Sequence, residues 1–404
     1  MPGSWQLTPM AYDLLSQNTM NTKSTPNRQS ATRAPLAGIR VVDFSTLLPG
    51  PMCSLLLAQV GAEVIKVERP GQGDEMRSYV PKFGQSSVNF ALLNQGKRSV
   101  TINLKDHVGL DEAVALVRTA DVLIEQFRPG VMDRLGLGYE AMRAVNPRLI
   151  YCSITGWGQD GPLAGMAAHD LNYQAESGLL GLTAGMDGTP GLPNALIADI
   201  AGGAYPAMMN ILLALRARDD DGAGRFIDVS MADNLFTFMY WGLGNGFTSG
   251  EWPVPGSDLV TGGTPRYQIY KTRDDRFLAA APLEQKFWDN FLRVLQAPEL
   301  LNDTLDPLKT REAIAAIIAT KTALEWEQLF AGVDACVSVV KSLQEAVTSP
   351  HFRERRLFEA HLASGNGVHI PALPLPIVRE FLQDTPGQVP ALGEADSILL
   401  DRQA

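Results

Sequence analysis

Length, composition and charge limit what this chain can be. It has 404 residues, 45% hydrophobic and 19% charged, which is the balance of a folded protein with room for two domains. The formal net charge of -10 argues against nucleic acid as a partner, because binding phosphate backbones needs a basic surface. One phosphorylated ligand could still bind a local basic site. The sequence contains no uninterrupted run of about 18 apolar residues, so we expect neither a membrane span nor a membrane partner.

Cysteine and histidine usage indicates a reducing compartment and no bound metal. The cysteines Cys53, Cys152 and Cys336 are scattered and odd in number, with no CxxC pair among them. The five histidines lack the spacing of metal ligands. We therefore expect a cytoplasmic protein without a metal site.

The N-terminal stretch, residues 1–35, is polar and lacks the apolar core of a secretory signal. We expect a disordered extension, and Met20 is an alternative natural start. The basic residues Lys23, Arg28 and Arg33 keep an organelle-targeting signal open as a weaker alternative.

After this extension, β-branched strands alternate with apolar helices. A strand at Gly38–Phe44, a helix at Met52–Val60 and a strand at Glu63–Glu68 fit a βαβ unit with parallel pairing. The alternation continues with expected strands at 99–104, 121–127, 148–154 and 224–229, and expected helices at 109–120 and 139–145. This order predicts an α/β fold with an open, doubly wound sheet, in which ligands bind beyond the carboxyl ends of the strands. The loops at those ends are 45–51, 69–77, 128–134 and 155–170.

A second, smaller α+β domain is expected further along the chain. A hairpin (267–270 and 277–281) is followed by helices at 286–295 and 311–329. A tail rich in proline follows, and we expect it to return to the large domain. The expected division is a large domain at 36–235, a linker at 236–261, a small domain at 262–345 and a C-terminal segment at 346–404.

Several common catalytic and nucleotide-binding motifs are missing from the sequence. There is no Gly-x-Ser-x-Gly elbow, and Asn94–Ser99 (NQGKRS) lacks the first glycine of a P-loop. No Gly-x-Gly-x-x-Gly follows the first strand. The sheet therefore suggests a nucleotide-like ligand held by scattered contacts, without a metal, a flavin or a hydride carrier.

Polar residues in apolar surroundings are the candidate catalytic groups. His169 stands out because imidazole exchanges protons near neutral pH. Asp199 lies in an apolar, glycine-flanked run, where a lone carboxylate is costly to bury, and it could be a nucleophile or base. Glu284 precedes an expected helix. For Asp199, Glu284 and Asp170 a helix-capping role is an equally simple interpretation.

Basic residues gather near the expected strand ends. Solvated surface charge is the ordinary interpretation, although a ligand with several phosphates would need a few of them. They are Lys66, Arg69, Arg77, Lys97, Arg98, Lys105, Arg128 and Arg134.

Six segments, in order from Leu36 to Asp396, resemble the family III CoA-transferase (CaiB/BaiF) superfamily, which includes the α-methylacyl-CoA racemases. They are GIRVVDFSTLLPGPMCSLLLAQVGAEVIKVERPGQGD, NQGKRSVTINLKD, FRPGVMDRLGLGYE, LIYCSITGWGQDGP, IADIAGG and GTPRYQIYKTRDDR. The resemblance implies an interlocked homodimer, each subunit with a large Rossmann-like domain and a small domain. It implies coenzyme A as part of the substrate and no prosthetic group.

The resemblance also assigns residues to the site. Asp199 matches the family's catalytic aspartate, and His169 with Tyr173 matches the racemase motif HDLNY, with Glu284 able to orient the histidine. The positions that match CoA contacts are Leu47, Leu48, Arg69, Ile102, Lys105, Gln126, Phe127, Arg128, Arg134 and Tyr173.

The superfamily divides between two reactions. In the racemases, an aspartate and a histidine remove and return the α-proton of an acyl-CoA thioester. In the transferases, the aspartate attacks the thioester and then carries CoA to an acceptor carboxylate. His169 favours a 2-methylacyl-CoA racemase of lipid or branched-acid catabolism. Ala195 argues the other way, because racemases tend to have asparagine four residues before the aspartate. A CoA-binding paralogue without turnover is a third alternative.

Overall fold

The computed structural model describes residues 34–183, 189–301, 306–364, 367–383 and 387–400. The expected N-terminal extension, residues 1–35, lies outside this part of the chain except for its last two residues.

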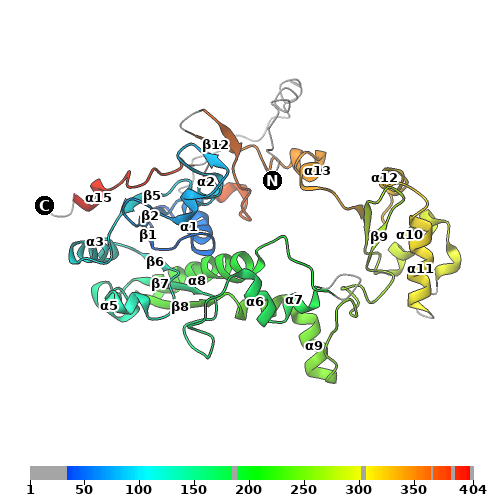
Figure 1. The fold of residues 1–404 in the computed structure, drawn as a ribbon, viewed down its shortest axis with the longest axis horizontal. Helices are drawn as coiled ribbons and strands as arrows, with labels where there is room; N and C mark the ends of the chain where they lie inside the picture. The colour runs from blue at the N-terminus through cyan, green and yellow to red at the C-terminus, as the bar shows by residue number, and fades with distance from the viewer. Residues whose placement is uncertain (1–33, 184–188, 302–305, 365–366, 384–386, 401–404) are drawn as a thin grey trace, which may run out of the picture. The chain divides into compact units, whose positions relative to one another are not determined.

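A six-stranded, all-parallel sheet forms the centre of the larger part of the molecule, in the order β5-β2-β1-β6-β7-β8 (Figure 1). Its strands are β1 (Arg40–Asp43), β2 (Glu63–Glu68), β5 (Arg98–Thr101), β6 (Val122–Glu125), β7 (Ile150–Thr155) and β8 (Arg225–Ser230). The strands are short and, except for the edge strand β8, mostly buried, as expected for a sheet covered on both faces. The prediction of a parallel α/β sheet is confirmed.

Helices cover both faces of this sheet because successive strand residues point to opposite sides. The core on one face contains Val41 together with residues of α1 and α8, whereas the core on the other face contains Val42 together with residues of α3 and α5. One face carries α1 (Pro49–Gln59), α2 (Val88–Asn94), η2 (Ala198–Ala204, a π-helix) and α8 (Tyr205–Asp221). The other carries α3 (His107–Arg118), α4 (Val131–Arg134), α5 (Tyr139–Val145) and α15 (Ser397–Leu400).

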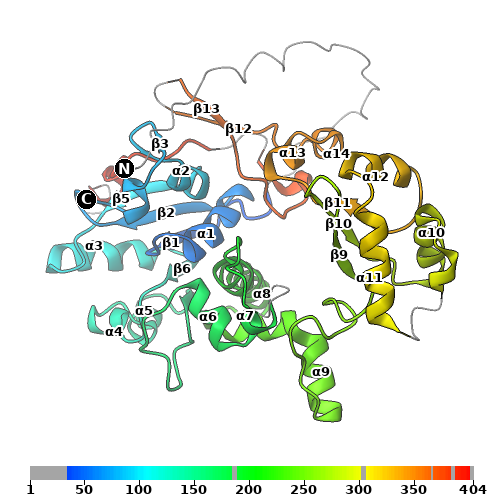
Figure 2. The same ribbon diagram turned by 45° about the vertical axis from the view of Figure 1, so that its right-hand side comes forward.

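A second hydrophobic core forms around the three-stranded sheet β11-β10-β9 (Figure 2). Trp288, Phe291 and Trp326 are its largest buried side chains. The elements are β9 (Gln268–Lys271), β10 (Phe277–Ala280), α10 (Gln285–Leu295), η4 (Pro298–Leu301), α11 (Pro307–Ile318), α12 (Ala323–Phe330) and β11 (Val337–Val339). The antiparallel hairpin is confirmed, and β11 is a third strand that the sequence analysis missed.

The single helix expected at 311–329 is wrong, because two helices occupy this stretch. The first, α11, ends at Ile318, and α12 begins at Ala323. Between them, the Thr322 hydroxyl accepts from the Glu325 amide while the Glu325 carboxylate accepts from the Thr322 amide. This capping box starts a new helix, so an apolar pattern that continues across it does not describe one helix.

The remaining elements lie before and after the second core in the sequence. Those before the second core are η1 (Glu75–Ser78), β3 (Lys82–Phe83), β4 (Ser86–Ser87), α6 (Asp170–Glu176), α7 (Leu179–Leu182), η3 (Asp233–Met239) and α9 (Tyr240–Ser249). Those after it are α13 (Leu343–Val347), α14 (Pro350–Glu354), β12 (His361–Ala363), β13 (His369–Pro371) and η5 (Arg379–Phe381). The expected linker at 236–261 is thus helical in its first half.

The C-terminal segment contacts the first strands of the chain. The Ala395 amide donates to the Ser99 carbonyl oxygen (2.9 Å), and the Asp396 carboxylate accepts from the Thr101 amide (2.7 Å) and hydroxyl. Arg77 donates to the Pro390 carbonyl oxygen. These contacts cover the outer side of β5, which is an edge strand of the parallel sheet.

One helical stretch in the described part of the chain is long and apolar enough to cross a membrane, by length and composition alone. It runs from Ala198 to Asp221, and 44% of its apolar window is buried inside the protein. The stretch comprises η2 and α8, and the buried sides of both helices pack against α1 and the parallel sheet. A core helix passes the same test, so the stretch is weak support for a membrane segment.

Candidate active site

A cavity of about 370 Å³ lies beyond the carboxyl ends of β1, β6 and β7. Its walls come from the loops that follow these strands and from α6 and η2. The residues that line it are Leu47, Leu48, Pro49, Gln126, Phe127, Arg128, Pro129, Ile154, Thr155, Gly156, Trp157, Ala164, Met166, Ala167, Ala168, His169, Asn172, Tyr173, Asp199 and Met231. Three of the four loops singled out in the sequence contribute to this lining.

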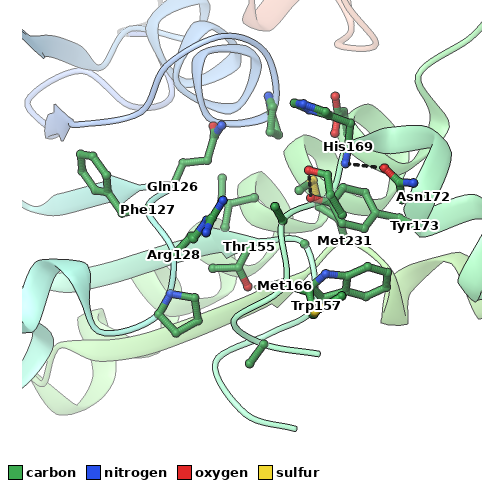
Figure 3. A pocket seen from close by; sticks show the side chains of 18 of the residues that line it. Gln126, Phe127, Arg128, Thr155, Trp157, Met166, His169, Asn172, Tyr173 and Met231 are labelled. Atoms are coloured by element: carbon green, nitrogen blue, oxygen red, sulfur yellow. Dashed lines mark hydrogen bonds between the residues drawn. The ribbon is translucent and has the colours of Figure 1, made fainter. Parts of the chain in front are cut away.

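His169 and Asp199, which are 30 positions apart in the sequence, line this one cavity. His169 is the residue before α6, and its side chain is exposed. The His169 amide donates to Oδ1 of Asn172 (3.0 Å), which fixes the backbone at the start of the helix (Figure 3). The structure therefore brings together the imidazole and the carboxylate that the sequence analysis proposed as a pair.

Asp199 is the second residue of the π-helix η2, so the helix-capping interpretation is wrong for this residue. π-Helices are rare in proteins, and π-helical turns often occur at functional sites. This π-helix is rich in glycine. A Cβ atom on Gly202 would lie 2.5 Å from the Met231 carbonyl oxygen, and one on Gly203 would lie 3.2 Å from Pro49. Only glycine lets this segment pack so closely, and the packing fixes where Asp199 faces.

Asp170 is a partner of Asp199 that the sequence analysis treated only as a capping candidate. Its side chain is 4% exposed, and Oδ1 accepts a hydrogen bond from the Asp199 amide (2.9 Å). Oδ2 accepts from Nε2 of Gln174 (2.6 Å). Burial, and then the charge of Asp170, raise the pKa of Asp199 to about 7. Asp199 can therefore hold or release a proton near neutral pH.

Tyr173 and Trp157 form an aromatic wall of the cavity. Their rings meet edge to face with centroids 4.9 Å apart, and the Tyr173 hydroxyl donates to the Ala168 carbonyl oxygen (3.0 Å) (Figure 3). Burial, followed by the charges of Asp199 and Asp170, raises the pKa of Tyr173 to about 12. The sequence analysis included Tyr173 and missed Trp157, since a lone tryptophan after a strand gives no separate signal.

The residues expected to contact CoA fall into two groups. Leu47, Leu48, Gln126, Phe127, Arg128 and Tyr173 line the cavity. Arg69, Ile102, Lys105 and Arg134 are not among its lining residues. The side chain of Ile102 is buried in the core, whereas Arg69, Lys105 and Arg134 are exposed just beyond β2, β5 and β6. All three lie at the carboxyl-terminal side of the parallel sheet, after the neighbouring strands β2 and β5 and after β6, which β1 separates from β2.

Glu284 does not line the cavity either. It precedes α10, beside the second core, and its side chain makes no capping hydrogen bond in that helix. Among the described residues, no group of three or more His, Cys, Asp or Glu side chains could hold a metal ion.

Three of the basic residues near the strand ends are not solvated surface charges. Lys66 pairs with Asp74 (2.9 Å), Lys97 with Asp43 (3.5 Å) and Arg77 with Glu68 (2.6 Å), and all are buried. The ordinary interpretation as surface charge is wrong for Lys66, Arg77 and Lys97. No local motif in the sequence marks their partners, which lie on β1 (Asp43), on β2 (Glu68) and in the loop after β2 (Asp74).

Comparison with known proteins identifies the family. The model of CoA-transferase family III matches residues 36–396. The chain belongs to CoA-transferase family III. It is 36% identical over 328 residues to alpha-methylacyl-CoA racemase of Homo sapiens, covering 80% of this chain and 82% of that one. It is 34% identical over 366 residues to acetyl-CoA:oxalate CoA-transferase of Acetobacter aceti, covering 88% and 92%.

Solved structures agree with this family assignment. A CaiB/BaiF family protein from Brucella suis is 29% identical, with a TM-score of 0.77 over 92% of this chain and 100% of that one. Rv3272 from Mycobacterium tuberculosis is 27% identical, with a TM-score of 0.77 over 91% of this chain and 99% of that one. The relatives carry both racemase and CoA-transferase names, so the family alone does not choose between the two reactions.

Proposed function

We propose that this family III protein is an acyl-CoA racemase that inverts the α-carbon of a 2-methylacyl-CoA thioester by two-base proton transfer. The observation that carries the proposal is that His169 and Asp199 line the same cavity. Inversion needs one group to remove the α-proton and a second to return a proton to the opposite face. The enolate formed between these steps needs hydrogen-bond donors near the thioester oxygen.

The protonation of Asp199 supports proton transfer over nucleophilic attack. Its pKa of about 7 keeps a large share of the side chain neutral at physiological pH. A neutral carboxylic acid can return a proton, whereas attack on a thioester needs the carboxylate. The imidazole of His169 can complement it, because one group is a base when the other is an acid.

Basic residues support a CoA thioester as the substrate. Arg128 lines the cavity mouth, and Arg69, Lys105 and Arg134 are exposed beyond the same edge of the sheet. We propose that they bind the phosphates of CoA, with the acyl group directed towards His169. Because the Ile102 side chain is buried, any contact it makes with CoA uses its main chain. No prosthetic group is required by this reaction.

We further propose a cytoplasmic homodimer in which Glu284 orients His169. Large exposed apolar side chains over α8, η3 and α9 favour a protein–protein interface. They are Met209, Leu213, Phe236, Phe238, Tyr240 and Phe247. Sedimentation velocity tests the dimer, since a monomer at micromolar concentration would contradict it.

A CoA-transferase that uses Asp199 as the nucleophile is the second candidate. Its support is a transferase relative that matches 88% of this chain, together with Ala195 at the position where racemases tend to have asparagine. In this reaction the Asp199 carboxylate would displace CoA from the thioester to form a mixed anhydride, and CoA would then attack the Asp199 carbonyl, releasing the donor acid and leaving an aspartyl thioester. An acceptor carboxylate would take CoA from Asp199 by the same two steps in reverse.

Deuterium exchange distinguishes the two reactions. Each enantiomer of a 2-methylacyl-CoA is incubated in heavy water with no acceptor acid, and NMR follows deuterium and chirality at the α-carbon. Racemisation predicts deuterium in both products and loss of chirality. His169→Gln and Asp199→Asn should each abolish inversion while leaving exchange of the one enantiomer whose proton faces the remaining base.

The other outcomes are equally specific. Absence of exchange, together with a CoA adduct on Asp199 that forms with the acyl-CoA donor alone and disappears when an acceptor acid is added, would establish transfer instead. Tight binding of CoA without turnover of any thioester would make the chain a non-catalytic paralogue.

A further inference from the structure

Four charged side chains are buried beneath residues 45–51, which comprise the end of the loop after β1 and the first three residues of α1 and which we call the loop Ser45–Pro51. Asp43, Lys66, Asp74 and Lys97, which we name the buried charge network, are each no more than 3% exposed. They form two ion pairs, each between a lysine and an aspartate. Burial lowers the pKa of Lys97 to about 7, although Asp43 opposes this shift. For Asp43 burial acts in the upward direction, but Lys97 and Lys66 outweigh it and lower the pKa.

The network holds the main chain of the loop at four points. Nζ of Lys66 donates to the Ser45 carbonyl oxygen (2.8 Å), and Nζ of Lys97 donates to the Pro51 carbonyl oxygen (2.9 Å). The Asp43 carboxylate accepts from the Ser45 amide (2.9 Å). The Asp74 carboxylate accepts from the Leu47 amide (3.2 Å). Both ends and the middle of one short loop are therefore tied to buried charges.

The loop conformation is one that needs such restraint. Leu47 has a φ of 62°, in the left-handed region that side chains other than glycine rarely adopt. Its amide is the group held by Asp74. Gln126, which follows β6, adds a further tie by accepting from the Gly50 amide (2.9 Å). The chain keeps a strained residue in place by surrounding it with fixed hydrogen bonds.

This loop is a wall of the cavity, while the network stands behind it. Leu47, Leu48 and Pro49 line the cavity, and none of the four network residues does. The helix that continues from the loop, α1, packs against η2, the helix that carries Asp199. A shift of the loop would move both the substrate-binding wall and the support of the catalytic carboxylate.

We propose that Lys97 and its network are positioning residues that hold the loop Ser45–Pro51 in the conformation that binds the CoA thioester. The proposal rests on the proposed function only in taking CoA thioesters as the ligand of this cavity. This positioning role differs from ordinary core packing, because core packing would stabilise the fold without setting ligand affinity. Preorganised loops bind more tightly because less ordering is needed on binding.

The test uses variants that remove the tie from Lys97 to the loop. Lys97→Met leaves Asp43 buried without its partner, and this protein could fail to fold. The double variant Asp43→Asn with Lys97→Met removes one charge of each sign, so no buried charge is left unpaired. The amide oxygen introduced by Asp43→Asn can still accept from the Ser45 amide. The hydrogen bond from Lys97 to the Pro51 carbonyl oxygen is lost.

Arg218→Met is the matched control. Arg218 is also a buried cation that pairs with a carboxylate, Asp121 (2.9 Å), and donates to a main-chain carbonyl, that of Arg148 (3.1 Å). These contacts lie before β6 and β7, at the amino ends of the strands and so at the sheet edge opposite the cavity. Its loss should lower the melting temperature without changing CoA affinity.

Two measurements are made on each full-length variant. Calorimetry gives the Kd for CoA, and hydrogen exchange with mass spectrometry gives the protection of peptides that contain Leu47 and Gly50. In the double variant we expect the Kd to rise about tenfold or more and these peptides to exchange about tenfold faster. The KM of the active reaction should rise with the Kd.

Wild-type Kd and wild-type protection at the loop in the folded double variant would overturn the proposal. An equal rise in Kd for Arg218→Met would also overturn it, by showing that general destabilisation is enough. Failure of the wild-type protein to bind CoA at all would instead count against the proposed function. The two failures are therefore distinguishable.

Discussion

The main-chain amide of Asp199 donates a hydrogen bond of 2.9 Å to Oδ1 of Asp170, a buried carboxylate on the adjoining helix. The bond fixes the first turn of η2, and the charge of Asp170 acts on the Asp199 carboxyl group. Asp170 is thus both a structural support and an electrostatic neighbour of Asp199, and its influence on Asp199 can be measured.

Asp170→Asn keeps an acceptor for the Asp199 amide but removes the charge. Because that charge contributes to the raised pKa of Asp199, the pKa should fall and less of the neutral acid should remain at pH 7. At pH 7 we expect the deuterated enantiomer that forms when Asp199 protonates the α-carbon to appear about tenfold more slowly. The pH profile of exchange should move to lower pH, and an unmoved profile would contradict this role of Asp170.

Arg128 should bind a phosphate of the ligand. It is exposed at the cavity and has no ion-pair partner among the salt bridges of the described residues. Arg128→Met should raise the Kd for CoA about tenfold and weaken the dependence of that Kd on salt concentration, because a charge-assisted contact is lost. Arg143→Met is the control, since Arg143 is exposed on α5 and, among the described residues, forms an ion pair with Glu140 alone. Equal affinities for wild type and Arg128→Met would argue that the phosphates lie elsewhere.

Gly202 should tolerate no side chain. A Cβ atom there would meet the Met231 carbonyl oxygen at 2.5 Å, so the π-helix would have to move away from the segment after β8. We expect Gly202→Ala to cost about 1–3 kcal/mol of stability and to lower activity at least about tenfold through displacement of Asp199. Gly181→Ala, in α7 with open space around it, serves as the control. Urea unfolding and the exchange assay measure the two effects, and a fully active Gly202→Ala would show that η2 is not rigid.

Glu125 should make stability depend on pH. Burial raises the pKa of Glu125 from 4.5 to about 7, although hydrogen bonds from Ser153 and the Phe127 amide act in the opposite direction. Between these values the folded protein retains a proton that the unfolded chain releases, so the free energy of unfolding falls as pH rises through this window. Glu125→Gln should remove this loss, amounting to about 2–3 kcal/mol between pH 5 and 8. Urea titrations of both proteins at the two pH values provide the check, and parallel pH dependences would contradict it.

The parallel sheet was predictable because its strands are short, β-branched and separated by helix-length apolar segments. β2 matches its predicted bounds, and α5 does so as well. The helix expected at 311–329 shows the limit of this approach. Apolar spacing continues through Thr322, and only the reciprocal hydrogen bonds with Glu325 divide the stretch into two helices.

The candidate site was predictable in its residues and not in its supports. His169 and Asp199 stand out locally as polar groups in apolar segments. By contrast, Asp170 looks like any acidic residue at a helix start, and Lys97 looks like a surface charge next to Arg98. Their roles depend on contacts with residues far away in the sequence, such as the 54 positions that separate Lys97 from Asp43.

The outer side of β5 is covered by residues 393–396, and Asp396 bonds to Thr101 across 295 positions of sequence. An uncovered edge strand offers free amide and carbonyl groups to any other strand nearby. During synthesis on the ribosome the sheet can therefore assemble long before the segment that protects its edge emerges. We expect nascent chains halted before residue 393 to be prone to aggregation, and chaperones that bind strand edges to matter most during that interval.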